Sequence, residues 1–186
     1  MHDRLSRIQY LLHKFEIPEK DQRKNKLSIN QITEFEAKFD LYFPEEFVNL
    51  LLLCNGSFAG EGGIFGLHQE QRVLDIEYYF ELFPYWLSAK WIPVASDGCG
   101  NYFVCVANTQ FEGKAPVVFI DSAIGYDQIA YVVASNLFDF LIFYLESSLG
   151  ETGWPFDLEF VVRADPDILN FRCLQLPWDQ GCISRS

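Results

Sequence analysis

The apolar residues of the first 55 positions predict three helices. Residues 4–15 carry Leu and Ile side chains at helical spacing. Ser28 followed by Gln31 fits a capping box, which predicts that a second helix starts there and buries its Phe side chains. Pro44 begins a third helix that is apolar on most sides and that ends at residues 55–56, Asn-Gly. Residues 19–26, EKDQRKNK, contain no apolar residue and are typical of a loop.

The period of the apolar residues changes after residue 56. A glycine-rich loop precedes a short predicted strand around residues 64–67, and residues 73–87 favour a helix that ends at Pro84. Runs of β-branched and aromatic residues, separated by turn residues, then predict an antiparallel meander. Its expected strands span residues 91–95, 102–107, 116–121 and 129–133, with a tight turn at 96–101.

The last quarter of the chain returns to helix. Asn136 and Asp139 begin a strongly apolar helix that ends near Gly150. Beyond it we expect one more strand at residues 158–162 and a short helix at 165–171. The predicted fold is therefore α+β, an antiparallel sheet of about four to six strands packed against helices. We expect an N-terminal helical extension (residues 1–27), one α+β domain (28–150) and a C-terminal extension packed on it (151–186).

Charge is unevenly distributed along the 186 residues, whose formal net charge is −12. Residues 1–27 hold seven basic and four acidic side chains, whereas residues 28–186 hold seven basic and 22 acidic ones. A body of net charge −15 repels phosphate backbones and anionic membranes, so we expect no direct nucleic-acid or membrane ligand. It would attract a basic protein by electrostatic steering. The alternative is that the acidity only keeps the protein soluble.

The cysteines and the N-terminus indicate the compartment. Five cysteines, an odd number without a CxxC pair, indicate a reducing environment. The first residues lack the apolar core and cleavage site of a signal peptide. The densest apolar stretch, residues 137–145, is too short to cross a bilayer. We expect a soluble, cytoplasmic protein.

Several motifs together resemble the SUKH superfamily, which includes fungal cell-wall assembly regulators of the Smi–Knr type and many bacterial toxin-immunity proteins. The similarity covers roughly residues 28–149. The matching pieces, in chain order, are Ile32-x-x-Phe35-Glu36, Phe43-Pro44-Glu45-Glu46-Phe47, Leu50-Leu51, Asn55-Gly56, Ile64-Phe65-Gly66-Leu67, Trp91-Ile92-Pro93-Val94-Ala95, Asp97-Gly98-x-Gly100-Asn101-Tyr102-Phe103 and Ser135 to Leu141. The first 27 residues and the long tail depart from the pattern.

The resemblance implies a protein-binding module without a cofactor. In bacteria such proteins often neutralise a toxin domain, commonly a nuclease or deaminase, whose basic surface an acidic body would complement. The expected partner is therefore a basic protein, specifically a toxin domain, that this chain occludes. The alternative is a regulatory scaffold of the cell-wall assembly type, with several partners.

The candidate binding residues are aromatic side chains and acids at the ends of loops. Aromatic residues favour the centre of an interface, and acids could pair with Lys or Arg of a partner. They are Tyr85, Trp86, Trp91, Asp97, Asn101, Asp121 and Asp127. The alternative for each acid is an ordinary solvated side chain, and some of the aromatic residues must be core.

Catalytic chemistry is the third alternative. A hydrolase could use Cys105, a Cys–His pair formed by Cys99 or Cys105 with His68, or the carboxylates of Asp97 and Asp121. The sequence has no clustered Cys and His at zinc spacing, no phosphate-binding GxxxxGK[ST] and no GxSxG. We therefore predict no catalytic residue, no metal and no cofactor.

Overall fold

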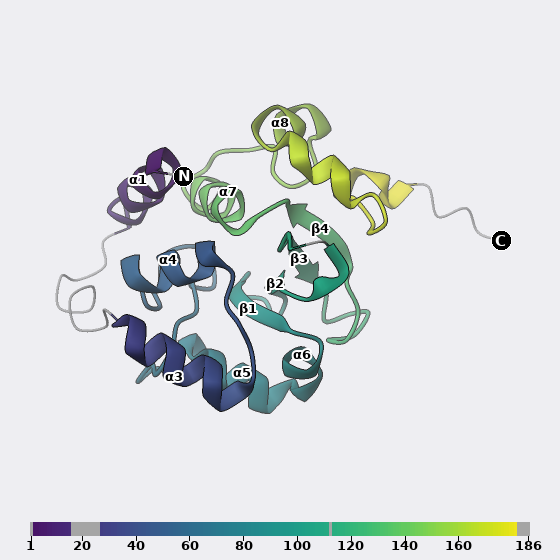
Figure 1. The fold of residues 1–186 in the computed structure, drawn as a ribbon. Helices are drawn as coiled ribbons and strands as arrows, with labels where there is room; N and C mark the ends of the chain where they lie inside the picture. The colour runs from purple at the N-terminus through teal and green to yellow at the C-terminus, as the bar shows by residue number, and fades with distance from the viewer. Residues whose placement is uncertain (1, 16–26, 112, 182–186) are drawn as a thin grey trace.

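The computed structural model describes residues 2–15, 27–111 and 113–181 of the chain (Figure 1). Its first helix, α1 (His2–Leu12), confirms the predicted N-terminal helix. The predicted loop at residues 19–26 lies outside the described residues.

Two short helices follow, α3 (Ile29–Phe39) and α4 (Glu45–Leu53). The capping box is present: the Gln31 amide donates to the Ser28 hydroxyl, and the Ser28 amide donates to the Gln31 side chain at 3.0 Å. Pro44 is the N-cap of α4, one position earlier than its predicted place inside the helix. The chain turns at Gly56 with φ +79°, as expected for a glycine after a helix end.

The segment between α4 and the sheet differs most from the predictions. Ile64 forms isolated bridges to Ser57 and Ala95 rather than part of a strand. The expected single helix is three short elements: η1 (Arg72–Leu74), α5 (Ile76–Leu82) and α6 (Pro84–Ser88). Pro84 begins α6 instead of only ending α5, because the first position of a helix does not require an N–H.

The four strands of the meander are β1 (Trp91–Ser96), β2 (Tyr102–Val106), β3 (Val117–Ile120) and β4 (Tyr131–Ala134). They pair in chain order and antiparallel, with η2 (Thr109–Phe111) between β2 and β3. Tyr102 opposes Ile120, and Phe103 opposes Phe119. The α+β fold class with an antiparallel sheet and an N-terminal helix is confirmed.

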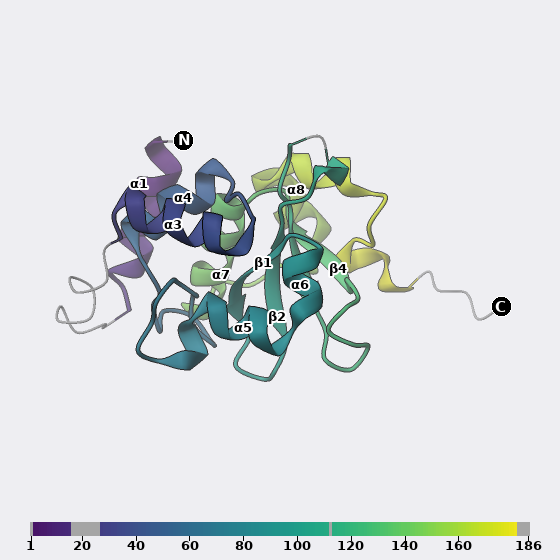
Figure 2. The same ribbon diagram turned by 60° about the horizontal axis from the view of Figure 1, so that its bottom comes forward.

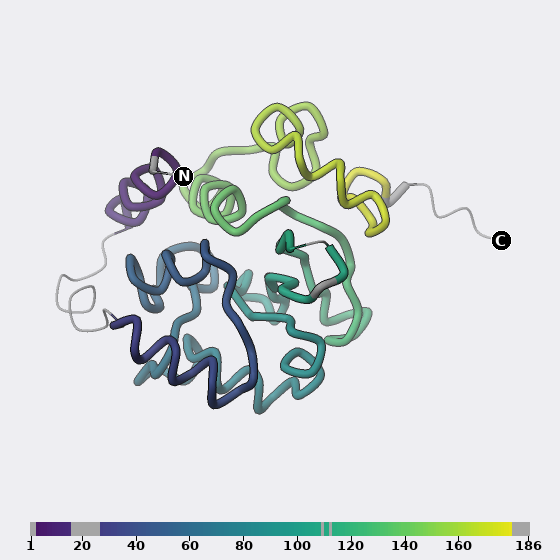
Figure 3. Tube along the Cα trace, in the orientation of Figure 1, coloured from purple at the N-terminus to yellow at the C-terminus, as the bar shows by residue number. Residues whose placement is uncertain are grey.

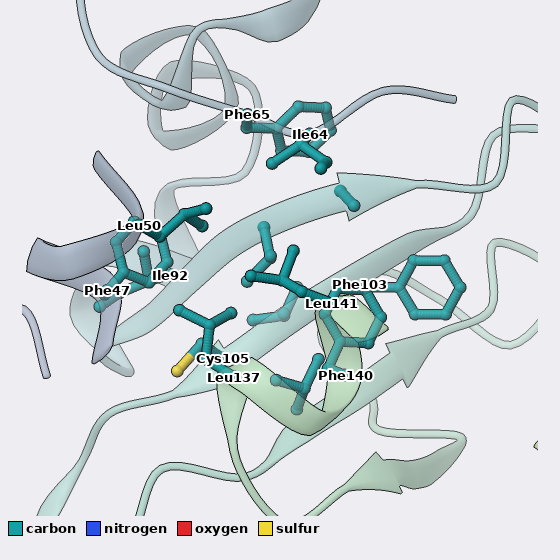
Figure 4. Packing of buried hydrophobic residues seen from close by; sticks show 14 of the residues in the cluster. Phe47, Leu50, Ile64, Phe65, Ile92, Phe103, Cys105, Leu137, Phe140 and Leu141 are labelled. Carbon is teal, nitrogen blue, oxygen red and sulfur yellow. The ribbon is translucent and has the colours of Figure 1, made fainter. Parts of the chain in front are cut away.

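Helices cover both faces of the sheet. On one face, α7 (Leu137–Ser148) packs Phe140 against Phe103, with ring centroids 5.0 Å apart. Figure 4 shows these rings together with Cys105 and Leu137 in the same core. On the other face, Tyr102 meets α6 through Trp86, at 5.5 Å between rings. Each large apolar side chain buried in this way contributes about 1.5–3 kcal/mol before the entropic cost of ordering it.

The C-terminal segment consists of α8 (Leu158–Ala164) and two 3-10 helices, η3 (Pro166–Phe171) and η4 (Pro177–Gly181). The predicted strand at 158–162 is wrong. The Asp157 carboxylate accepts a hydrogen bond from the Phe160 amide at 3.0 Å, which caps a helix start. The segment contacts β4, where the Val132 amide donates to the Gln175 carbonyl at 2.9 Å. The traced chain shows α1 and α8 on either side of α7 (Figure 3).

Candidate protein-binding surface

Two connections of the meander lie at the same end of the sheet (Figure 2). Each antiparallel strand reverses the direction of the one before it, so every second connection falls at the same end. They are the β1–β2 turn (residues 97–101) and the β3–β4 loop (121–130). In the turn, the Asp97 carboxylate accepts from the amides of Cys99 at 2.8 Å and Asn101 at 3.1 Å, and from the Asn101 side chain at 2.7 Å. Gly98 and Gly100 provide the positive φ angles of +75° and +95° that this turn requires.

Asn101 joins the turn to the β3–β4 loop. Its side-chain oxygen accepts from both the backbone amide and the hydroxyl of Ser122, each at 2.9 Å. The neighbouring Asp121 carboxylate accepts from the Ala123 amide at 2.8 Å, so it is fixed at the start of the loop. Asn101 thus hydrogen-bonds Asp97 on one side and Ser122, the residue after Asp121, on the other.

A third loop, residues 56–63, reaches the same place. The Ser96 hydroxyl donates to the Gly62 carbonyl at 2.9 Å. The buried Tyr144 hydroxyl donates to the Ser96 carbonyl at 2.9 Å and accepts from the Gly62 amide at 3.0 Å. A side chain at Gly62 would lie 2.3 Å from the Gly98 nitrogen, so only glycine permits this approach. It places the exposed Glu61 beside the Asp97 turn.

Aromatic side chains line the face of the sheet next to these acids. Tyr126 of the β3–β4 loop stacks on Phe83 at 4.4 Å and lies 5.9 Å from the Tyr102 ring. Tyr126 is 37% exposed and Tyr102 is half-buried. The Trp86 indole donates to the Tyr126 carbonyl at 2.6 Å, so a buried residue of α6 fixes the position of the exposed loop.

We call this arrangement the sheet-end surface and define it as Glu61, Asp97, Asn101, Tyr102, Asp121, Tyr126 and Asp127. It combines four carboxylates with two tyrosines. In the sequence from residue 91 to 162 the one Lys or Arg is Lys114, which lies in the β2–β3 connection at the opposite end of the sheet. The surface therefore has a concentrated negative charge that no basic side chain of the sheet neutralises.

The hydroxyls of Tyr102 and Tyr131 remain proton donors at neutral pH. Burial raises the pKa of Tyr102, and the neighbouring Tyr126, Tyr78 and Asp97 add to the rise. Burial, with Asp121 and Asp97, raises the pKa of Tyr131 to about 12. The sheet-end surface thus presents the protonated hydroxyl of Tyr102 close to the Asp97 carboxylate.

The structure brings together four of the seven predicted binding residues, Asp97, Asn101, Asp121 and Asp127. Trp86 is fully buried and Trp91 is 6% exposed, so both rings belong to the core. Tyr85 is exposed and lies edge-on to Trp91 at 5.2 Å, close to the opposite end of the sheet. Sequence reasoning missed Glu61, Tyr102 and Tyr126. The glycines around Glu61 were a usable signal of a close approach, whereas nothing local distinguishes Tyr126.

A hollow of about 340 Å³ lies at that opposite end. Trp86 and Trp91 form part of its wall, together with Leu41, and the exposed ring of Tyr42 lies at its edge. Lys90 crosses its rim and donates to the Asp40 carbonyl. Asp40 and Lys90 both adopt positive φ angles, +46° and +57°.

The thiol proposed for hydrolysis is enclosed in the core. Cys105 is fully buried, its Sγ lies 3.7 Å from the Ala115 carbonyl, and burial raises the pKa of the thiol far above its usual range. His68 is exposed and packs edge-on against Phe35 at 5.9 Å. Asp97, the first carboxylate of the other candidate pair, already accepts three hydrogen bonds within its own turn. Within the described part of the chain, no three His, Cys, Asp or Glu side chains are grouped as a metal site would require.

Among residues 2–15, 27–111 and 113–181, no helix has the length and apolar character needed to cross a bilayer.

Comparison with known proteins identifies the family. The fold is that of a small α+β domain with a meander sheet and an acidic loop end. The model of the SMI1 / KNR4 family (SUKH-1) matches residues 26–142, more than half of the chain, and the protein belongs to this family. No curated protein matches the sequence.

Proposed function

We propose that the protein is a binding module that recognises a basic protein through the sheet-end surface. The observation that carries the proposal is the convergence of three loops that places four carboxylates around two partly exposed tyrosines, and no ion pair among the described residues involves these carboxylates. We further propose that the partner is a toxin domain, and that binding occludes the toxin's active site. Membership of a family that generally serves in immunity or regulation, rather than catalysis, supports this.

Charge and rings would act at different stages of binding. Concentrated negative charge accelerates the encounter with a basic partner and selects against acidic ones. At contact, a Lys or Arg over a tyrosine ring gains about 0.5–2 kcal/mol, depending on how dry the contact is. An ion pair at 4 Å gains about 1 kcal/mol in bulk water and about 4 kcal/mol at the effective dielectric of a protein surface.

The surface is already ordered by internal hydrogen bonds. Asp97 and Asn101 are fixed within the turn, and Trp86 holds the Tyr126 backbone. Side chains that are fixed before binding avoid the ordering cost of about 0.5–1.5 kcal/mol per side chain. The fixed carboxylates of Asp97 and Asp121, on two of the three loops, suit an inhibitor that must fit a preformed basic cleft.

The test starts by isolating the partner. The tagged chain is purified from its own cells, the co-purifying polypeptide is identified, and its affinity is measured by titration calorimetry. The variant E61K/D127K reverses two exposed charges of the surface, and E34K/E159K makes the same charge change elsewhere. We expect the first variant to bind at least about tenfold more weakly and the second to bind like wild type, because only the first places like charges opposite the partner.

A growth assay separates inhibition from scaffolding. Cells that express the partner should survive when wild-type chain is co-expressed and should die with E61K/D127K. A partner of acidic pI, or equal binding by both variants, would contradict the proposal. Several co-purifying partners and no protection would indicate a regulatory scaffold instead.

A further inference from the structure

The face of α7 that α1 covers carries the chemistry of a second docking site. Arg4 pairs with Asp139 at 2.9 Å, and Arg7 pairs with Glu146 at 2.6 Å. Asp139, Ile142 and Glu146 lie at positions i, i+3 and i+7 of α7, so helical spacing places them on one face. The face thus carries a carboxylate toward each end, with the apolar side chain of Ile142 between them.

The helix that occupies this face is amphipathic and basic. Its apolar residues Ile8, Leu11 and Leu12 are buried, with Ile8 fully so. Within α1 itself, the two bases Arg4 and Arg7 outnumber the one acid, Asp3. A positively charged helix therefore lies on a negatively charged, apolar helix, which is the helix-on-groove mode by which amphipathic segments bind proteins.

The occupying helix lies outside the family unit. The family match begins at residue 26, after α1, and ends at residue 142 within α7. Figures 1 and 3 show α1 at the periphery, against α7. An isolated helix of 11 residues is marginal in water, so α1 depends on this contact for its structure.

We propose that this α7 face is a docking surface for a basic amphipathic helix of a partner protein, and that α1 is a tethered occupant that such a helix displaces. Because α1 belongs to the same chain as α7, it competes intramolecularly with a partner helix, so it weakens the binding of that helix without abolishing it. The α7 face and the sheet-end surface share no residue, so the variants that test one leave the side chains of the other unchanged.

The test uses a synthetic peptide of residues 2–15 with a fluorescent label as the probe. Binding to the full-length chain is followed by fluorescence anisotropy. In R4E/R7E each ion pair becomes a pair of like negative charges, so α1 is repelled from α7 and the α7 face becomes accessible. K38E/R72E changes the charge by the same amount on α3 and η1, where both side chains are exposed. Circular dichroism verifies that each variant is folded.

We expect the peptide to bind R4E/R7E at least about tenfold more tightly than it binds wild type or K38E/R72E, because the tethered competitor is removed. A peptide with both arginines replaced by glutamate should not bind. Equal binding by all three proteins, or no binding by R4E/R7E, would overturn the proposal.

Hydrogen exchange of the wild-type protein gives an answer even if R4E/R7E fails to fold. A displaceable α1 should exchange its amides by local opening, faster than the amides of β1 and β2. Exchange of α1 amides as slow as that of β1 and β2 would show that the helix is a permanent part of the core and would overturn the proposal.

Discussion

Tyr144→Phe tests whether one buried hydroxyl assembles the sheet-end surface. Tyr144 is 2% exposed, and its hydroxyl joins α7 to β1 through the Ser96 carbonyl and to the Glu61 loop through the Gly62 amide. Burial raises the pKa of this hydroxyl to about 12, so it is a donor at every physiological pH. The substitution removes the oxygen and keeps the ring, which packs on Phe103 and Phe140.

The magnitude follows from the two lost hydrogen bonds. Each contributes about 1 kcal/mol net, and a buried carbonyl left without a donor adds to the loss, so we expect about 2–4 kcal/mol of destabilisation. At about 2–4 °C per kcal/mol for a chain of this size, a loss of 2 kcal/mol lowers Tm by about 4–8 °C. Thermal unfolding followed by circular dichroism measures it.

Tyr131→Phe is the matched control. Tyr131 is similarly buried, but its hydroxyl makes no hydrogen bond to the residues that the structure describes. We expect its loss to change stability by no more than about 0.5 kcal/mol. If Tyr144→Phe is no more destabilising than Tyr131→Phe, the hydroxyl does not hold the loops together, and the argument for a preassembled surface is refuted.

Two further predictions concern the α7 start and the Trp86 contact. Burial is the main cause that raises the pKa of Glu46, Asp139 and Asp165 above their ordinary values of 4.5, 3.8 and 3.8. A raised folded-state pKa means that the folded protein binds protons more readily than the unfolded chain, so stability should rise as the pH falls from neutrality towards 4.5 and level off below 3.8. Urea unfolding across this range checks it: Glu46→Gln should reduce the rise, and a steady loss of stability on acidification would contradict it. Trp86→Phe removes the hydrogen bond to the Tyr126 carbonyl, which contributes about 1 kcal/mol. We expect weaker partner binding and faster amide exchange in the β3–β4 loop. Unchanged exchange in this loop would refute the role of Trp86 in positioning it.

Local signals in the sequence predicted most of the elements. The capping box at Ser28 and the cap at Asn136 depend on residues only three positions apart, and both are present. Errors arose where two local patterns compete. Residues 158–162 have strand-like composition, yet Leu158, Val161 and Val162 also fit helical spacing, and the Asp157 cap favours the helix.

The candidate site was predictable only where topology determines it. A meander places the 97–101 turn and the 121–130 loop at one end, so the acids of both could be grouped from sequence alone. The burial of Trp86 could not, because it depends on how α6 packs against the sheet. The contribution of Glu61 depends on a contact between glycines 36 residues apart, Gly62 and Gly98, which local patterns do not reveal.

The most direct test of the central claim is the salt dependence of association with the co-purified partner. Stopped-flow association rates are measured at about 0.05 M and 0.5 M NaCl, for wild type and E61K/D127K. Charge complementarity predicts a wild-type rate that falls by about tenfold or more with added salt, and a slower, less salt-sensitive rate for the variant. Association rates that are equal for both proteins and that do not change with salt concentration would contradict an electrostatic docking surface at this end of the sheet.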